Sequence, residues 1–166
     1  MSLYKYKLLR QALLRYERAK QSKEMYYVSE VARGSRGRGF GADIGREVHK
    51  AFWGLDPEVI LGTEEVSLPF PLAWRFRFGW LLGVADLVTF KNAIPTEVVE
   101  VKSYDAVKTY EATQASLYGL LIVLNFAVKP KVCVKTPKGM VVVADWENLA
   151  LQTLSVVRKQ LKSRVK

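Results

Sequence analysis

Gly-Val-Ala-Asp-Leu-Val-Thr-Phe at residues 83–90 and Thr-Glu-Val-Val-Glu-Val-Lys at residues 96–102 form the stretch that decides the fold. Both segments are rich in β-branched and apolar residues, and the residues between them include an asparagine and a proline. Such segments are typical of strands, and a short break of this kind is typical of a turn. We therefore predict two consecutive strands joined by a short hairpin.

The second of these strands carries two charged residues on one face. Because side chains alternate along a strand, Glu100 and Lys102 emerge together while Val99 and Val101 point the other way. In the preceding strand Asp86 stands among apolar neighbours, where an unpaired charge would be costly. Considered alone, Glu100 and Lys102 are better interpreted as an ion pair at a sheet edge. Together with Asp86, they indicate a metal site.

Two carboxylates from adjacent strands can hold a hard divalent cation such as Mg²⁺ or Mn²⁺ through oxygen ligands. Such a cation lowers the pKa of an attacking water, binds a phosphate oxygen and neutralises charge in the transition state. The Lys102 ammonium could orient the water or stabilise the reacting phosphate. Asp86, Glu100 and Lys102 are therefore the predicted catalytic residues of a phosphodiester-cleaving centre, with Asp86 and Glu100 as metal ligands.

The rest of the chain predicts helices and strands in a mixed order. Apolar residues at three- and four-residue steps predict helices, and segments rich in β-branched and aromatic residues predict strands. The predicted helices cover residues 3–23, 43–53, 106–126 and 150–165, a loop rich in glycine and arginine covers 33–41, and the other predicted strands cover 59–68, 75–81, 131–135 and 140–144. This order predicts an α+β fold.

Length and charge bound the domain organisation and the partner. A chain of 166 residues with 49% apolar content predicts one domain over residues 1–166, with an N-terminal helix and Arg/Gly loop at 1–41 and a catalytic core at 42–166. Lysine and arginine outnumber aspartate and glutamate by 26 to 16, and the formal charge of +10 favours a nucleic acid partner. From charge alone, a merely basic protein or one that rests on acidic lipid remains an alternative.

Cysteine usage and hydropathy indicate the cellular setting. Cys133 is the only cysteine, so one chain forms neither a disulfide nor a cysteine-based metal cluster, and a reducing interior fits best. The apolar run at residues 117–128 is shorter than the ~20 residues that a membrane-spanning helix needs. No charged-then-apolar leader opens the sequence. We predict a cytoplasmic protein without a membrane partner.

The order of these acidic and basic residues resembles a known family. Asp86 followed by Glu-Val-Lys at residues 100–102 is similar to the signature of the PD-(D/E)XK nuclease superfamily. Ala85 stands where the name-giving proline would be. However, Gly-Val-Ala-Asp at residues 83–86 resembles the Gly-x-x-Asp motif of the RecB-type branch, which includes the CRISPR-associated exonucleases.

Two further motifs resemble the same branch. Residues 114–118, Gln-Ala-Ser-Leu-Tyr, fit its Gln-x-x-x-Tyr motif, and the spacing of four places both polar side chains on one helix face. Residues 45–49, Gly-Arg-Glu-Val-His, fit its Gly-x-x-x-His element. The resemblance implies that Gln114 and Tyr118 shape the active site and contact DNA, and that His49 is a further metal ligand. Without the resemblance, a buried amide, a packed aromatic and an ordinary histidine are the alternatives.

The resemblance covers residues 45–118 and implies a fold and an activity. The fold would be a restriction-endonuclease-like core, with a central mixed sheet flanked by helices. The activity would be that of a Mg²⁺- or Mn²⁺-dependent deoxyribonuclease, preferentially an exonuclease on single-stranded DNA or DNA ends. His49, Asp86, Glu100 and the Val101 carbonyl would hold the metal.

The resemblance also frames the partners and the alternatives. The arginines of the glycine-rich loop would contact phosphates: Arg33, Arg36 and Arg38. Several relatives hold an iron–sulfur cluster with four cysteines, so a single cysteine implies no iron–sulfur cluster here. A homo-oligomer and a helicase or CRISPR partner are open, as are repair, recombination and CRISPR adaptation. The alternatives are a non-catalytic nucleic-acid-binding subunit and a Holliday junction resolvase-like endonuclease, against which the Gln-x-x-x-Tyr helix argues.

Overall fold

The computed structural model describes residues 3–34, 56–103, 107 and 109–165, with side chains as far as residue 162. The helices are α1 (Leu3–Gln21), α2 (Val28–Arg33), α4 (Pro57–Leu61), α5 (Thr109–Phe126) and α6 (Trp146–Val165). The strands are β1 (Met25–Tyr27), β2 (Glu65–Phe76), β3 (Gly79–Lys91), β4 (Ile94–Val101), β5 (Lys131–Thr136) and β6 (Gly139–Val142).

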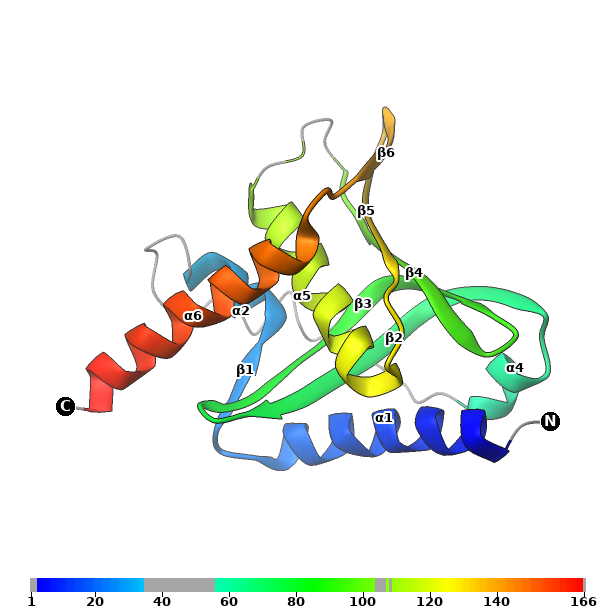
Figure 1. Cartoon of the computed structure of the whole chain (residues 1–166), viewed down its shortest axis with the longest axis horizontal. Coiled ribbons are helices and arrows are strands. Elements are labelled where there is room, and N and C mark those ends of the chain that lie inside the picture. Colours follow the sequence, from blue (N-terminus) through cyan, green and yellow to red (C-terminus); the bar gives the residue numbers. More distant parts are fainter. Residues whose placement is uncertain (1–2, 35–55, 104–106, 108, 166) are drawn as a thin grey trace.

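These elements form a six-stranded mixed sheet flanked by helices, which confirms the predicted α+β fold class. Figure 1 shows α1 running beneath β2 and β3, and α5 crossing in front of the strands, with α6 extending from beside its upper part to the left. Across the part of the chain that the structure describes, no helix is both long and apolar enough to span a bilayer.

Strand β3 organises the sheet. Strand β2 pairs antiparallel with β3 from one end to the other, so β1 and β4 share the opposite side of β3. Strand β1 pairs in parallel with residues 80–82, and β4 pairs antiparallel with residues 87–91. Residues 83–86 therefore lie between these two pairings, and this is the segment that ends in the predicted catalytic aspartate.

A β-bulge interrupts the regular alternation of β3. Leu68 of β2 pairs with Val88, and Phe70 pairs with Ala85, so two residue steps on β2 match three steps on β3. The additional residue lies at positions 86–87. Ala85 and Val88 consequently both face the main core, although regular alternation would place them on opposite faces. Bulges often redirect a side chain next to a functional site.

Helix α5 is almost entirely enclosed by the sheet and the other helices. Its Leu117 and Leu121 side chains are fully buried. At its C-terminal end the ring of Phe126 contacts the rings of Phe70 and Phe90, with centroids 6.0 and 6.1 Å apart. Aromatic pairs at such distances stabilise a core beyond the area that they bury. The helix is therefore rigidly attached to β2 and β3, which fixes the position of the side chains at its other end.

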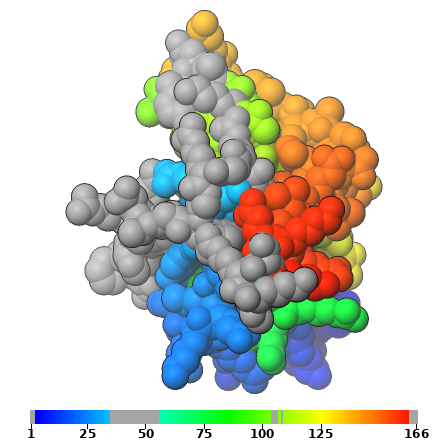
Figure 2. Space-filling model, turned by 90° about the vertical axis from the view of Figure 1, so that its left-hand side faces the viewer, coloured from blue at the N-terminus to red at the C-terminus, as the bar shows by residue number. Residues whose placement is uncertain are grey.

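Polar contacts join the helices to this core. Asn125 of α5 is buried, and its Nδ2 donates to the Ala73 carbonyl of β2 at 3.1 Å, while its Oδ1 accepts a 2.9 Å hydrogen bond from Arg15 of α1. Helix α6 lies beside α2, where Gln160 Nε2 donates to the Gly34 carbonyl at 3.1 Å. Figure 2 looks onto this end of the molecule, with α2 in light blue and α6 in red.

The strand predicted at 59–68 is wrong in its first half. Helix α4 occupies this part of the chain, and strand β2 begins only at residue 65. Asp56 caps the helix by accepting a 3.0 Å hydrogen bond from the Glu58 N–H, and Pro57 occupies the first turn, where its missing N–H is harmless. Asp56 and Pro57 therefore begin a helix here.

The predicted break between strands at 75–81 and 83–90 is also wrong. Strand β3 runs through Gly83, and the chain turns instead at residues 77–78. Two prolines within residues 69–74 argued against a strand there, yet β2 continues through them. In the described residues β2 pairs only with β3, and Pro69 lies at the register shift, so neither proline interrupts a central ladder.

Strand β1 and helix α2 were not predicted. They span three and six residues, too few to show a periodic apolar pattern. Arg33, which was predicted to open the glycine-rich loop, is instead the last residue of α2. The rest of that loop, residues 35–41, and the helix predicted at 43–53 lie outside the described residues.

Candidate active site

Strand β4 ends at the two charged side chains that the sequence singled out. Glu100 is only 2% exposed, and Lys102 directly follows the strand. Lys102 Nζ lies 3.8 Å from Glu100 Oε2, so these side chains emerge together, whereas Val101 between them is 43% exposed. Strand β4 pairs with β5 as far as Val101 but with β3 only as far as Val99, so this contact lies where one side of β4 is no longer paired with a strand.

Asp86 reaches the same place from β3. Its Oδ2 accepts a 2.8 Å hydrogen bond from the Val101 N–H. The pairing between β3 and β4 ends at Leu87 and Val99, so beyond this point the β4 backbone meets the Asp86 carboxylate instead of a strand. An extended residue directs its N–H and its C=O to the same side. The Val101 carbonyl is therefore on the side of Asp86.

The Glu100 carboxyl is buried and incompletely hydrogen-bonded. Its Oε1 has no hydrogen-bond partner among the residues that the structure describes. Burial raises the pKa of Glu100 well above its ordinary value, the charge of Asp86 raises it further, and Lys102 lowers it in part. Burial at this position therefore disfavours the ionised form of the carboxyl. A cation shared with Asp86 would supply the missing partner and favour the ionised form.

Three neighbours hold the Lys102 ammonium. Besides its contact with Glu100, Nζ donates to Gln114 Oε1 at 3.1 Å and lies 5.4 Å from the centroid of the Tyr110 ring. The Lys102 side chain is 17% exposed, and Gln114 is 9% exposed. Gln114 therefore holds the ammonium beside Glu100.

Tyr118 lies on the same face of α5 and packs on β3. Burial raises the pKa of Tyr118 well above its ordinary value, and the charges of Glu100 and Asp86 raise it further. If residue 83 had a Cβ, that atom would lie only 2.5 Å from the Tyr118 hydroxyl oxygen. Gly83 is therefore needed for the close approach of the Tyr118 ring, which explains a glycine in the middle of a strand.

Replacing Gly83 with alanine is expected to destabilise the protein by about 1–3 kcal/mol, because the added methyl group overlaps the Tyr118 hydroxyl. Tyr118→Phe removes that oxygen, so Gly83→Ala should cost less in the Tyr118→Phe background, by about 1 kcal/mol. Urea unfolding of the four proteins in this double-mutant cycle measures the coupling. Additive losses would show that the Tyr118 hydroxyl and a methyl group at position 83 do not overlap.

The structure brings together five of the residues predicted for the site: Asp86, Glu100, Lys102, Gln114 and Tyr118. Arg33 lies nearby, with its guanidinium carbon 5.4 Å from the Tyr110 ring centroid. His49, Arg36 and Arg38 lie outside the described residues. In the described ranges, no three His, Cys, Asp or Glu side chains gather as a metal site. The site as described therefore has the two carboxylates of Asp86 and Glu100.

Tyr110 is a site residue that the sequence analysis missed. It precedes Gln114 by four residues and Tyr118 by eight on the same helix. The helical spacing that relates Gln114 to Tyr118 therefore extends back to Tyr110, and this was the signal that could have identified it. Its ring is partly exposed, beside the Lys102 ammonium.

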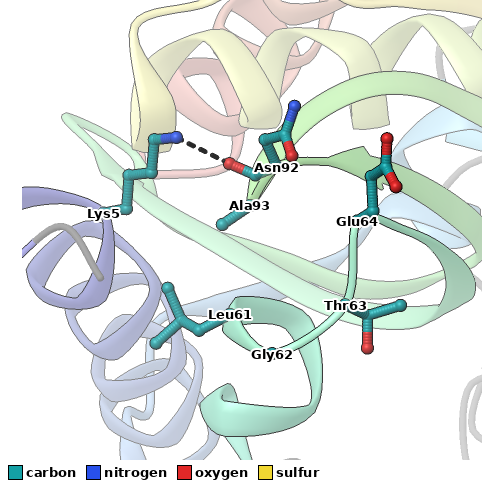
Figure 3. A pocket seen from close by; sticks show the side chains of 7 residues that line it. All are labelled: Lys5, Leu61, Gly62, Thr63, Glu64, Asn92 and Ala93. Atoms are coloured by element: carbon teal, nitrogen blue, oxygen red, sulfur yellow. Dashed lines mark hydrogen bonds between the residues drawn. The ribbon is translucent and has the colours of Figure 1, made fainter.

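A separate pocket of about 530 Å³ lies at the opposite end of β4 (Figure 3). It is lined by residues from α1, from the end of α4 and the segment after it, and from the turn between β3 and β4. Among the lining residues, Lys5 Nζ donates to the Asn92 carbonyl at 2.8 Å. Its lining includes none of the predicted site residues and only one carboxylate, that of Glu64. The chemistry described above therefore lies elsewhere.

Comparison with known proteins adds no assignment. No family model matches the chain, and no curated protein matches it. Among solved structures, the chain is similar to the crystal structure of SSO0001, with a TM-score of 0.41 and 15% sequence identity, over 96% of this chain and 88% of that chain. A likeness of this size carries no functional argument, so the function has to be inferred from the site.

Proposed function

We propose that this protein is a divalent-metal-dependent deoxyribonuclease whose centre is formed by Asp86, Glu100 and Lys102. The observation that carries this proposal is the buried Oε1 of Glu100, which lacks a partner in the described residues, beside a second carboxylate and an ammonium group. A buried carboxylate of this kind is costly to a fold unless something binds it. A cation fits that need.

The available donor atoms suit Mg²⁺ or Mn²⁺. Asp86 and Glu100 offer carboxylate oxygens and Val101 a backbone carbonyl, and these are the hard ligands that such cations prefer. When bound, such a cation activates water and neutralises charge on a phosphate. In the family that the sequence resembles, a histidine at the position of His49 would add a nitrogen ligand.

Lys102 would act on the substrate, and Gln114 and Tyr118 would support the site around it. The Lys102 ammonium is placed to neutralise the negative charge that grows on a phosphate during cleavage. Gln114 restricts the ammonium to one position through its 3.1 Å hydrogen bond. Tyr118 is buried and fills the space between α5 and Gly83.

We propose single-stranded DNA or DNA ends as the substrate and the cytoplasm as the location. The formal charge of +10 supports a polyanionic substrate, because lysine and arginine side chains that contact phosphates release bound counterions. The resemblance of the motifs to RecB-type nucleases supports ends over a defined duplex sequence. A helicase or CRISPR-associated subunit, or a second copy of the chain, would be a partner in that setting.

The direct test is cleavage of labelled single-stranded DNA by the purified protein with Mn²⁺. We expect degradation by the wild type and none by Asp86→Asn, whose amide oxygen can still accept the Val101 N–H and so preserve the local fold. DNA binding by Asp86→Asn should remain close to that of the wild type. Cleavage that persists in Asp86→Asn would point to a contaminant, and a wild type that binds but never cleaves would be a binding subunit.

The affinity for Mn²⁺ is expected to rise with pH. The pKa of Glu100 is raised, so a proton competes with the cation for this carboxyl at every pH below that raised value. Binding should therefore release a proton and weaken as the pH falls. Titration calorimetry in buffers of different ionisation enthalpy measures the number of protons released, and Glu97→Gln, on the opposite face of β4, should release the same number as the wild type.

A further inference from the structure

The ring of Tyr110 lies beside two cations from different elements. The Arg33 guanidinium carbon at the end of α2 and the Lys102 Nζ after β4 are each 5.4 Å from the ring centroid. This is within the range at which the negative face of an aromatic ring attracts a cation. Helix α2 packs against α5, which carries Tyr110 in its first turn. One ring therefore contacts the charged ends of two long side chains.

The Tyr110 ring can restrict both side chains and offset the repulsion between their charges. Lysine and arginine side chains have many rotamers, and two positive charges close together repel each other. The electron-rich ring face offsets part of that repulsion and restricts both side chains. On Lys102 it acts together with Gln114.

The ligand that suits two neighbouring cations is a pair of phosphates along one strand. Arginine and lysine are the usual phosphate-binding side chains, and phosphate contacts set the register of a nucleic acid. Helix α5 begins at Thr109, and the positive end of its dipole adds to the same potential. Lys102 lies with the proposed metal ligands, so its phosphate is the one to be cleaved, and Arg33, at the end of α2, would contact a neighbouring phosphate.

We propose that Tyr110 is a positioning residue, which holds Lys102 for the scissile phosphate and Arg33 for an adjacent phosphate of the same DNA strand. This inference rests on the proposed nuclease function. It predicts that Tyr110 affects both kcat, through Lys102, and DNA affinity, through Arg33. The hydroxyl has no part in this role, so only the ring is required.

The first experiment separates kcat from KM on labelled oligothymidylate with Mn²⁺. Tyr110→Leu is expected to lower kcat about tenfold and raise KM several-fold, the effect of losing one partly desolvated cation–ring contact at each end. Tyr110→Phe keeps the ring and should restore both constants to within about twofold of the wild type. Tyr4→Leu, an exposed tyrosine on α1, is the matched control and should leave both constants unchanged.

The second experiment needs no cleavage. In the Asp86→Asn background, binding of labelled oligothymidylate is measured by fluorescence anisotropy across a range of salt concentrations. Arg33→Gln should reduce the slope of log K against log salt by about 0.7, the value for one phosphate contact on a single strand. Tyr110→Leu should reduce the slope similarly, and the double variant should lose no more than either single variant. Tyr110→Phe should keep the full slope.

Three results would overturn the inference: Tyr110→Leu equal to Tyr4→Leu in both kcat and KM, failure of Tyr110→Phe to restore them, or fully additive losses with Arg33→Gln. If Tyr110→Leu does not fold, Tyr110→Met replaces it, because methionine retains bulk without an aromatic face. A wild type that binds DNA without cleaving it overturns the proposed nuclease, while the salt slopes still decide the Tyr110–Arg33 contact. The two failures are thus distinguishable.

Discussion

Glu100→Gln is expected to abolish Mn²⁺-dependent cleavage while making the metal-free protein more stable. Loss of one carboxylate ligand removes charge stabilisation of several kcal/mol, which corresponds to a fall in kcat of about a thousandfold or more. The gain in stability comes from burial. Glu100 is 2% exposed, and burial is the main reason why its pKa is raised, so its ionised form is unfavourable in the fold.

The direction of the pH dependence follows from the raised pKa. A carboxyl with a pKa above its unfolded value of about 4.3 contributes most to stability at lower pH. That contribution is lost as the pH rises from the unfolded pKa towards the folded one. Glutamine does not titrate, so the advantage of Glu100→Gln should be absent near pH 4 and grow with pH. Each 1 kcal/mol of advantage should raise Tm by about 2–4 °C in a domain of this size.

Thermal unfolding with and without Mn²⁺ measures both halves of this expectation. Mn²⁺ should raise Tm of the wild type by mass action and leave Tm of Glu100→Gln unchanged. Glu97→Gln on the same strand controls for the loss of one negative charge. Should Glu100→Gln prove less stable than the wild type at neutral pH without metal, the description of Glu100 as an incompletely bonded buried carboxyl would be wrong.

Lys102→Met should lower kcat by about 10²–10³-fold and leave Mn²⁺ binding in place. The ammonium acts on charge that develops in the transition state, and the loss of one such group typically has an effect of this size. The metal ligands are untouched, so the rise of Tm with Mn²⁺ should persist, in contrast to Glu100→Gln. Lys91→Met is the matched control, because Lys91 is exposed near the far end of β3.

Two outcomes would argue against the role assigned to Lys102. Full activity of Lys102→Met would exclude the ammonium from the reaction. Loss of the Mn²⁺ effect on Tm would mean that Lys102 supports the carboxylates rather than the phosphate. Its 3.8 Å contact with Glu100 makes this second outcome worth measuring directly.

The central part of the site could be predicted because it follows from short-range periodicity. Two-residue alternation places Glu100 and Lys102 together, and a four-residue step places Gln114 and Tyr118 on one helix face. Both patterns depend only on local backbone geometry. The structure shows Lys102 and Gln114 in contact, which neither pattern alone could give, because it depends on how α5 packs on the sheet.

The parts that could not be predicted depend on tertiary packing. Gly83 indicated a break between strands, but its small size serves the packing of Tyr118 across the sheet. Pro69 indicated the absence of a strand, but it lies on a strand that pairs on one side only, at a register shift. In both cases the local signal was real, and its cause lay in residues distant along the chain. Strand β1 was missed because three residues carry no periodicity.

The bulge in β3 determines to which face of the sheet the Asp86 carboxylate points. Before the bulge the odd-numbered residues face the main core, as Ala85 does, and after it the even-numbered residues do, as Val88 does. A chain shortened by one residue here would regain uninterrupted alternation and could still bury both apolar halves. Its aspartate would then point away from Glu100. Loss of a single codon at this position is therefore expected to leave a chain that folds but whose aspartate no longer reaches Glu100.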